Sequence, residues 1–173
     1  MEVMEYGDDV LYQKAKDVDE ITDDIKELVK KMFKTCYDYS GVGLAAPQVG
    51  KSIRMFILSI PPEDDSDTED RKKYEEEVFI NPVILTKKGS VTAEEGCLSV
   101  PGVYEKVKRA KFVTVEYTNL DGERKTIEAT GLMARAIQHE NDHLDGVLFI
   151  DRLPPLKQEV TKKKLNKEYG INF

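Results

Sequence analysis

The two histidines of this 173-residue chain lie four positions apart, and no other feature of the sequence constrains the fold so strongly. They belong to segment 138–143, which has the sequence Gln-His-Glu-Asn-Asp-His. Side chains four apart on an α-helix share one face, so His139 and His143 can chelate one metal ion. Glu140 is then placed to act as a general base on a water molecule beside the metal. The segment therefore predicts the metal-binding helix of a hydrolase.

Residues on both sides of this motif indicate that the helix is buried. Apolar side chains cover more than one of its faces, at Leu132, Met133, Ala136, Ile137 and Leu144. Buried imidazole and carboxylate groups need partners, and a metal ion would supply them. We expect Thr130 to cap a helix over 131–145 and Gly146 to end it. A chance match on an exposed helix is the alternative.

A hydrolytic metal site needs three protein ligands and one open position. The chain has no third histidine, so the third ligand must be a cysteine or a carboxylate. Cys97 follows Gly96 in a segment typical of a tight turn, which favours it as the ligand over its alternative role as a small buried residue. Cys36 falls on the apolar face of a predicted helix over 21–39 and is expected in the core.

Hydrophobic patterns predict the other elements. Strands are expected at 53–60, 78–85, 111–117 and 124–129, a terminal helix at 156–169, a loop at 40–50 and a charged surface loop at 61–77. Asn81-Pro82 predicts that the second strand is bent or lies at an edge. The predicted class is α+β: mostly antiparallel strands around a central metal-binding helix, with an N-terminal and a C-terminal helix, in one domain over 1–173.

Charge and composition exclude several classes of partner. The net charge is −7, which argues against a nucleic-acid site or an anionic membrane surface. No apolar run approaches the roughly 20 residues that span a bilayer, and the acidic N-terminus lacks a signal pattern. We expect a cytoplasmic protein. The basic segment from Lys157 to Lys167 is the candidate surface if the chain docks on the ribosome, and a solvated helix face is the alternative.

Three separated blocks carry a resemblance to a known family. They are 41–48 (Gly-Val-Gly-Leu-Ala-Ala-Pro-Gln), 95–99 (Glu-Gly-Cys-Leu-Ser) and 138–144 (Gln-His-Glu-Asn-Asp-His-Leu). In order and spacing they resemble the peptide deformylases. Residues 97–102 and the predicted terminal helix resemble the bacterial type 1 members, although the loop at 61–77 is longer than is usual for that type.

The resemblance implies an activity and its residues. Such an enzyme removes the formyl group from formyl-methionyl nascent polypeptides and releases formate. Cys97, His139 and His143 match the metal ligands, and Glu140 matches the general acid/base. Gln48 and the backbone N–H of Leu98 match the groups that stabilise the oxyanion. The resemblance implies Fe²⁺ in the cell, with Ni²⁺ or Co²⁺ as substitutes, whereas the affinity order of the ligands favours Zn²⁺.

The resemblance also implies where the substrate lies. Its backbone would pair with Val42-Gly43 and with Gly96 as an added strand. The methionine pocket would be lined by Val42, Ala93, Glu95, Leu132, Arg135, Ala136 and His139. Because a cation is unexpected there, we expect the stem of Arg135 to cover the pocket wall while its head reaches solvent or an acid such as Glu95.

Two other functions fit parts of the sequence. A zinc peptidase would cut internal bonds, but it would be expected to have a longer cleft and a different third ligand. A binding module with a structural metal would need a fourth protein ligand. Only Cys36 could supply a soft one, and Glu140 would then have no task.

Overall fold

A computed structural model describes residues 1–171 as three α-helices, a five-stranded antiparallel sheet and a two-stranded hairpin. The helices are α1 (Asp23–Asp38), α2 (Gly131–Leu144) and α3 (Pro155–Glu168). The sheet has the order β1 (Gly43–Ala45), β2 (Met55–Ile60), β3 (Glu75–Lys88), β6 (Phe112–Thr118), β7 (Arg124–Thr130). The hairpin pairs β4 (Val91–Cys97) with β5 (Val100–Arg109). The predicted α+β class is confirmed.

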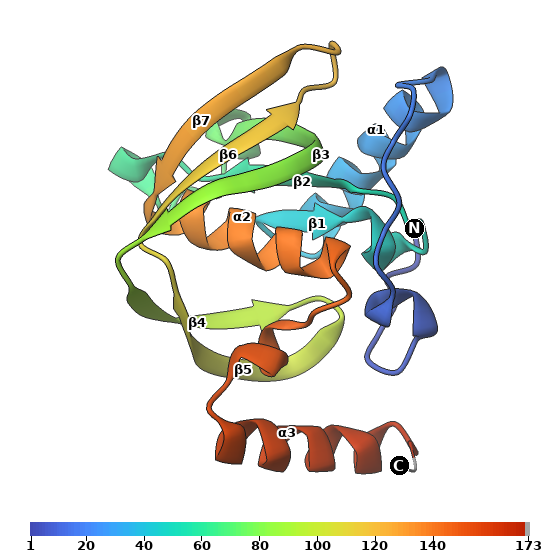
Figure 1. Cartoon of the computed structure of the whole chain (residues 1–173), viewed down its shortest axis with the longest axis vertical. Helices are drawn as coiled ribbons and strands as arrows, with labels where there is room; N and C mark the ends of the chain where they lie inside the picture. Colours follow the sequence, from blue (N-terminus) through green and yellow to red (C-terminus); the bar gives the residue numbers. More distant parts are fainter. Residues whose placement is uncertain (172–173) are drawn as a thin grey trace.

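Helix α2 lies between the five-stranded sheet and the hairpin, and α3 lies beyond the hairpin (Figure 1). Every residue of strand β2 is buried, and all of them except Ser59 are apolar. Its residues Phe56, Leu58 and Ile60 belong to the cluster that includes Ile137 of α2. Met55 and Ile57 face the opposite way and join the cluster under α1. The central helix is thus held by one face of the sheet, while the other face supports α1.

The predicted helices agree with the structure to within two residues at each end. Thr22 caps α1, accepting a hydrogen bond from the Ile25 N–H at 3.3 Å, and Cys36 is fully buried, as predicted. The expected cap of α2 is wrong in its mechanism. Thr130 occupies the N-cap position, but its hydroxyl donates to the Lys111 carbonyl instead of accepting a bond from the helix.

The strands differ from the predictions in two places, and a third prediction is confirmed in one of its two alternatives. Segment 40–50 is not a loop throughout, because it forms β1 and a 3-10 helix, Ala46–Val49. Residues 100–109 form β5, which the pattern did not predict. Strand β3 is interior to the sheet, not an edge, but it is bent as expected. Its register shifts between Ile80 and Val83, and this irregularity accommodates the missing N–H of Pro82.

None of the helices among the described residues is long and apolar enough to cross a lipid bilayer.

Candidate active site

The site forms where the hairpin meets α2. Cys97 is the last residue of β4, and His139 and His143 come from successive turns of α2. Their ligand atoms lie within 4.8 Å of one another, with Cys97 Sγ 3.4 Å from His143 Nε2. The structure therefore brings together the three residues that the sequence analysis selected, from segments more than 40 positions apart.

The donor set suits a divalent transition metal. One thiol and two imidazoles leave a position open in a tetrahedral site. Burial lowers the pKa of His143 well below its usual value, so its ring is held in the neutral form that binds metal. Burial also disfavours a proton on His139, but the hydrogen bond with Cys97 and the Glu140 charge raise its pKa. A bound cation would take the place of that proton.

Glu140 lies beside the three ligands in a buried setting. Burial raises the pKa of its carboxyl to about 7. Its Oε1 has no hydrogen-bond partner among the described residues, which leaves this oxygen available for a water molecule or substrate. The backbone of β1 comes close to the Glu140 carboxylate at Gly43, which has no side chain. A Cβ at this position would lie 2.8 Å from Glu140 Oε2. Such a carboxyl can exchange a proton near neutral pH.

Gln48 is fixed in one orientation inside the site. Its Oε1 accepts a hydrogen bond from the Ala45 N–H at 2.9 Å, and its Nε2 donates to Ser99 Oγ at 3.1 Å. The same Nε2 lies 3.5 Å from Cys97 Sγ. The side chain thus makes the backbone contact that a loop glutamine would make and still presents its amide N–H to the metal-binding residues.

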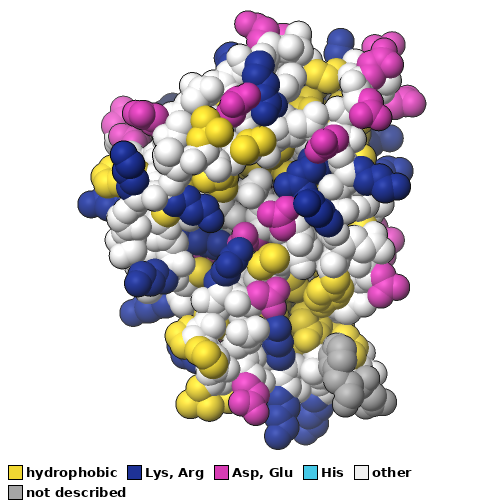
Figure 2. Space-filling view, in the orientation of Figure 1, with side chains coloured by type: hydrophobic (Ala, Val, Ile, Leu, Met, Phe, Trp, Pro, Cys, Tyr) yellow, Lys and Arg dark blue, Asp and Glu magenta, His cyan; other side chains and the backbone are white. Residues whose placement is uncertain are grey.

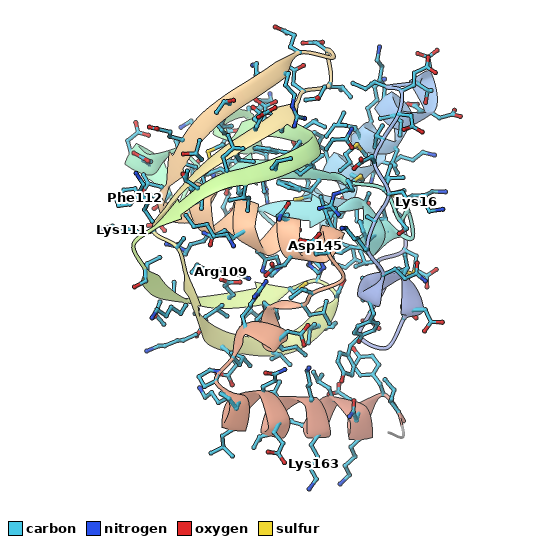
Figure 3. The ribbon with its side chains drawn as sticks, in the orientation of Figure 1. Lys16, Arg109, Lys111, Phe112, Asp145 and Lys163 are labelled. Atoms are coloured by element: carbon cyan, nitrogen blue, oxygen red, sulfur yellow. The ribbon has the colours of Figure 1, made fainter. Side chains whose placement is uncertain are left out.

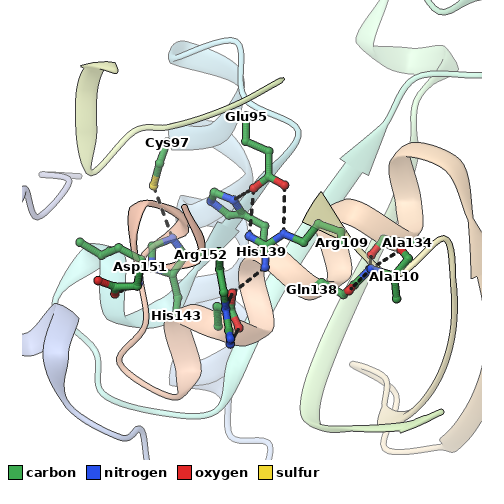
Figure 4. A network of polar contacts seen from close by, with 12 residues as sticks. Glu95, Cys97, Arg109, Ala110, Ala134, Gln138, His139, His143, Asp151 and Arg152 are labelled. Carbon is green, nitrogen blue, oxygen red and sulfur yellow. Dashed lines mark hydrogen bonds and ion pairs between the residues drawn. The ribbon is translucent and has the colours of Figure 1, made fainter. Parts of the chain in front are cut away.

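A network of ionic groups contacts the Nδ1 side of the His139 ring (Figure 4). Glu95 Oε1 is 2.9 Å from His139 Nδ1, and Arg109 donates to both Glu95 oxygens at 2.9 Å. Arg109 also contacts Asp142 at 2.6 Å, and Arg152 contacts the same carboxylate at 2.9 Å. Figure 3 shows Arg109 between α2 and the hairpin. The network orients the His139 ring and ties both elements together.

The sequence analysis did not select Arg109, Asp142 or Arg152. Asp142 lies inside the histidine motif, but alone it resembles any polar helix residue. Arg109 carried one usable signal, since on a strand it shares a face with Val107, which is buried. Without a prediction of β5, that alternation could not be used.

A cavity of about 520 Å³ opens onto Cys97, His139 and Glu140. Its lining includes the predicted catalytic groups and most of the predicted substrate residues: Val42, Gly43, Glu95, Gly96, Leu132, Arg135 and Ala136. Ala93 lies on β4 outside this lining, so its expected place in the pocket is wrong. The cavity also reaches Tyr39 and Tyr104, which no sequence pattern singled out.

For Arg135, the structure agrees with the expected place in the cavity wall and removes one of the two expected surroundings of its head group. Its side chain lines the cavity together with Leu132, Ala136 and His139, which share its helix face. Glu95 is not its partner, because that carboxylate is held by Arg109 and His139. The alternation of strand β4 turns Glu95 toward the network instead.

Comparison with known proteins gives a consistent result. The model of the family described as polypeptide deformylase matches residues 1–159. The peptide deformylase of Neisseria gonorrhoeae is 47% identical over 167 residues, covering 96% of this chain and 95% of that protein. The crystal structure of a peptide deformylase from Legionella pneumophila has a TM-score of 0.84 at 39% identity, covering 98% and 95% of the two chains. That of Synechococcus elongatus, in complex with actinonin, has a TM-score of 0.81 at 38% identity, covering 95% and 85%.

Proposed function

The chain belongs to the peptide deformylase family, the metal-dependent hydrolases that remove the formyl group from N-formylmethionine on nascent polypeptides, and on this premise we propose that Cys97, His139 and His143 hold its metal ion. The observation that carries the proposal is the convergence of these three side chains next to Glu140, with Cys97, His139 and Glu140 lining one cavity. A bound metal would polarise the formyl oxygen and acidify a water molecule.

Glu140 is the general base and acid of the proposed reaction. Its Oε1, which has no hydrogen-bond partner in residues 1–171, takes a proton from the attacking water. The water oxygen forms a bond to the formyl carbon, and the C–N bond to the methionine nitrogen breaks. Glu140 passes its proton to that nitrogen, so the products are formate and a free N-terminal methionine. A carboxyl whose pKa lies near 7 is suited to both transfers.

Gln48 Nε2 and the Leu98 N–H stabilise the negative charge on the formyl oxygen. Both groups line the cavity beside Cys97, and the Gln48 amide is held by Ala45 and Ser99. A donor held in place before the reaction costs no reorganisation when the charge develops.

The substrate peptide lies between the free edge of β1 and β4. Gly43 and Gly96 line the cavity from its two sides, and an extended peptide can pair with both as an added strand. The methionine side chain enters the pocket formed by Val42, Leu132, Ala136 and the stem of Arg135.

The finer assignments follow from the same premise. We propose Fe²⁺ as the metal in the cell, with Zn²⁺, Ni²⁺ or Co²⁺ able to bind the same ligands, and a cytoplasmic location, where nascent chains arise. The ribosome is a proposed partner through α3. Lys and Arg side chains gather over this helix at the foot of the molecule (Figure 2), and Lys163 points away from the rest of the chain (Figure 3).

Formate release tests the proposed function. The protein, loaded anaerobically with Fe²⁺, is incubated with formyl-Met-Ala-Ser, and formate is measured. We expect release that disappears when the metal is chelated. Cleavage of an internal peptide bond without formate release would favour a peptidase. If neither reaction occurs, the result would favour a binding module with a structural metal over an enzyme.

A further inference from the structure

The charged segment between β2 and β3 folds back toward the catalytic cavity. Residues 61–74 contain two short 3-10 turns, Glu63–Asp65 and Arg71–Lys73. The Tyr74 hydroxyl donates to the Thr68 carbonyl at 3.0 Å, and Lys73 pairs with Asp65 at 3.7 Å. The segment is therefore more than a solvated excursion, since it has hydrogen bonds and an ion pair of its own.

Arg71 is the residue through which this segment reaches the cavity wall. Its Nη1 donates to the Gly41 carbonyl at 2.8 Å. Its guanidinium lies 4.5 Å from the centre of the Tyr74 ring and 5.3 Å from that of Tyr37, which is on α1. The Tyr37 hydroxyl in turn donates to Glu76 at the start of β3. One planar cation thus contacts two aromatic rings and a backbone carbonyl.

The residues that Arg71 holds are those of the cavity wall just before β1. Residues 40–43 line the cavity, and Ser40 has a positive φ of 56°. The Gly41 N–H donates to Cys36 and the Val42 carbonyl accepts from the Ser59 N–H, both at 2.8 Å. Arg71 satisfies a further acceptor of this segment, the Gly41 carbonyl. These three bonds determine where the wall lies before a peptide arrives.

We propose that Arg71 is a positioning residue for substrate binding, which holds residues 40–43 so that the Gly43 backbone can pair with the peptide downstream of the formyl-methionine. This inference rests on the proposed function. A wall that is already ordered loses less conformational entropy when the peptide binds. Arg71 lies outside the cavity lining, so its contribution should appear in KM more than in kcat.

The test compares three variants of the metal-loaded protein. Arg71→Ala removes all three contacts, Arg71→Lys keeps the charge without the planar fork, and Lys72→Ala is the control at an exposed neighbour. With formyl-Met-Ala-Ser we expect Arg71→Ala to raise KM about 5- to 10-fold, the typical net contribution of one hydrogen bond, with kcat changed less than about twofold. Arg71→Lys should fall between, and Lys72→Ala should match the wild type.

Two further measurements separate positioning from a merely structural role. With formyl-methionine, which has no downstream residues to pair, the KM increase of Arg71→Ala should be much smaller. Hydrogen exchange of the backbone amides in residues 40–44 should be faster in Arg71→Ala than in Lys72→Ala. An equal KM increase on both substrates, or unchanged exchange, would overturn the inference. Failure of the wild type to release formate would reject the proposed function, while the exchange comparison would still decide what Arg71 holds.

Discussion

At the scale of single residues, Glu140 is the group whose surroundings most directly predict a variant. It contacts the cavity but is not one of the three ligand residues. We expect Glu140→Ala to retain bound metal, measured by elemental analysis, and to lose about 10²- to 10⁴-fold in kcat, since a proton-transfer group contributes on that order. Glu128→Ala, at an exposed position of β7, is the control. Loss of metal from Glu140→Ala would contradict the assigned role.

Glu95 predicts how stability depends on pH. Burial alone would raise its pKa, but hydrogen bonds with His139 and Arg109 lower it from 4.5 to about 2. A lowered pKa means that this carboxylate stabilises the fold above pH 4.5 and that the stabilisation is lost as pH falls toward 2. A fall of about 2.5 pKa units corresponds to about 3 kcal/mol.

The comparison of Glu95→Gln with the wild type, both metal-free, measures this contribution. The free energy of unfolding of the variant should be lower by up to about 3 kcal/mol near pH 6, and the difference should narrow toward pH 2. Glu128→Gln should show no such trend. A difference that stays constant over the whole range would mean that Glu95 acts through packing and not through its charge.

The three residues proposed to bind the metal could be selected from the sequence, whereas the ionic network of Glu95, Arg109, Asp142 and Arg152 could not. His139 and His143 share one helix turn, so their spacing alone defines a shared face. The selection of Cys97 depended on two further arguments: the chain has no third histidine, and segment 95–99 resembles the corresponding block of the peptide deformylases. Arg109 and Arg152 act through Asp142 and Glu95 from other elements, and their pairing depends on how the hairpin docks on α2. No local pattern contains that information.

At the scale of elements, the glycine that follows α2, Gly146, is predicted to be important for stability. Gly146 has φ +75°, and a Cβ there would lie 2.7 Å from the Tyr12 backbone. Gly122, in the turn between β6 and β7, has φ +86° but open space around it. Both alanine variants share the cost of a left-handed backbone, about 1 kcal/mol, and only Gly146→Ala adds a clash with a neighbouring chain segment.

Thermal and denaturant unfolding of the two variants separates these costs. We expect Gly146→Ala to lose at least about 1 kcal/mol more than Gly122→Ala, because the Tyr12 backbone must move. If both variants lost the same free energy of unfolding, the backbone around Tyr12 would be able to move away from the new Cβ without loss of stability. In that case the bond from the Ala15 N–H to the Leu144 carbonyl, at 2.8 Å, would not hold the helix end firmly.

Helices and the β6–β7 hairpin followed from local periodicity, but β1 and β5 did not. A pattern of three- and four-residue steps is visible in α1 because one face is buried and the other exposed. β1 is only three residues long and contains Gly43, so its pairing with β2 determines it as a strand. β5 carries charged residues among its apolar ones because one side of the hairpin faces solvent, which obscured the alternation.

At the scale of the whole molecule, the proposed metal site lies between two substructures and would link them. The hairpin pairs within itself and not with the five-stranded sheet, and α2 lies between them. Cys97 belongs to the hairpin, while His139 and His143 belong to the helix. A metal ion bound by all three would link the two parts, in addition to the contacts of Arg109 with Glu95 and Asp142.

Metal removal should therefore loosen the molecule unevenly. A ligand that binds only the folded state stabilises it by about 4 kcal/mol at 1,000 times its Kd, so chelation should lower Tm and added metal should restore it. Hydrogen exchange should quicken more in β4 and β5 than in β6 and β7, because the loss of the metal frees Cys97 from α2. Cys97→Ser should show the lowered Tm with little recovery on metal addition. If hydrogen exchange became faster to the same extent in the hairpin and in the five-stranded sheet, the metal would not act as a specific link between the hairpin and α2. It would then stabilise the fold as a whole.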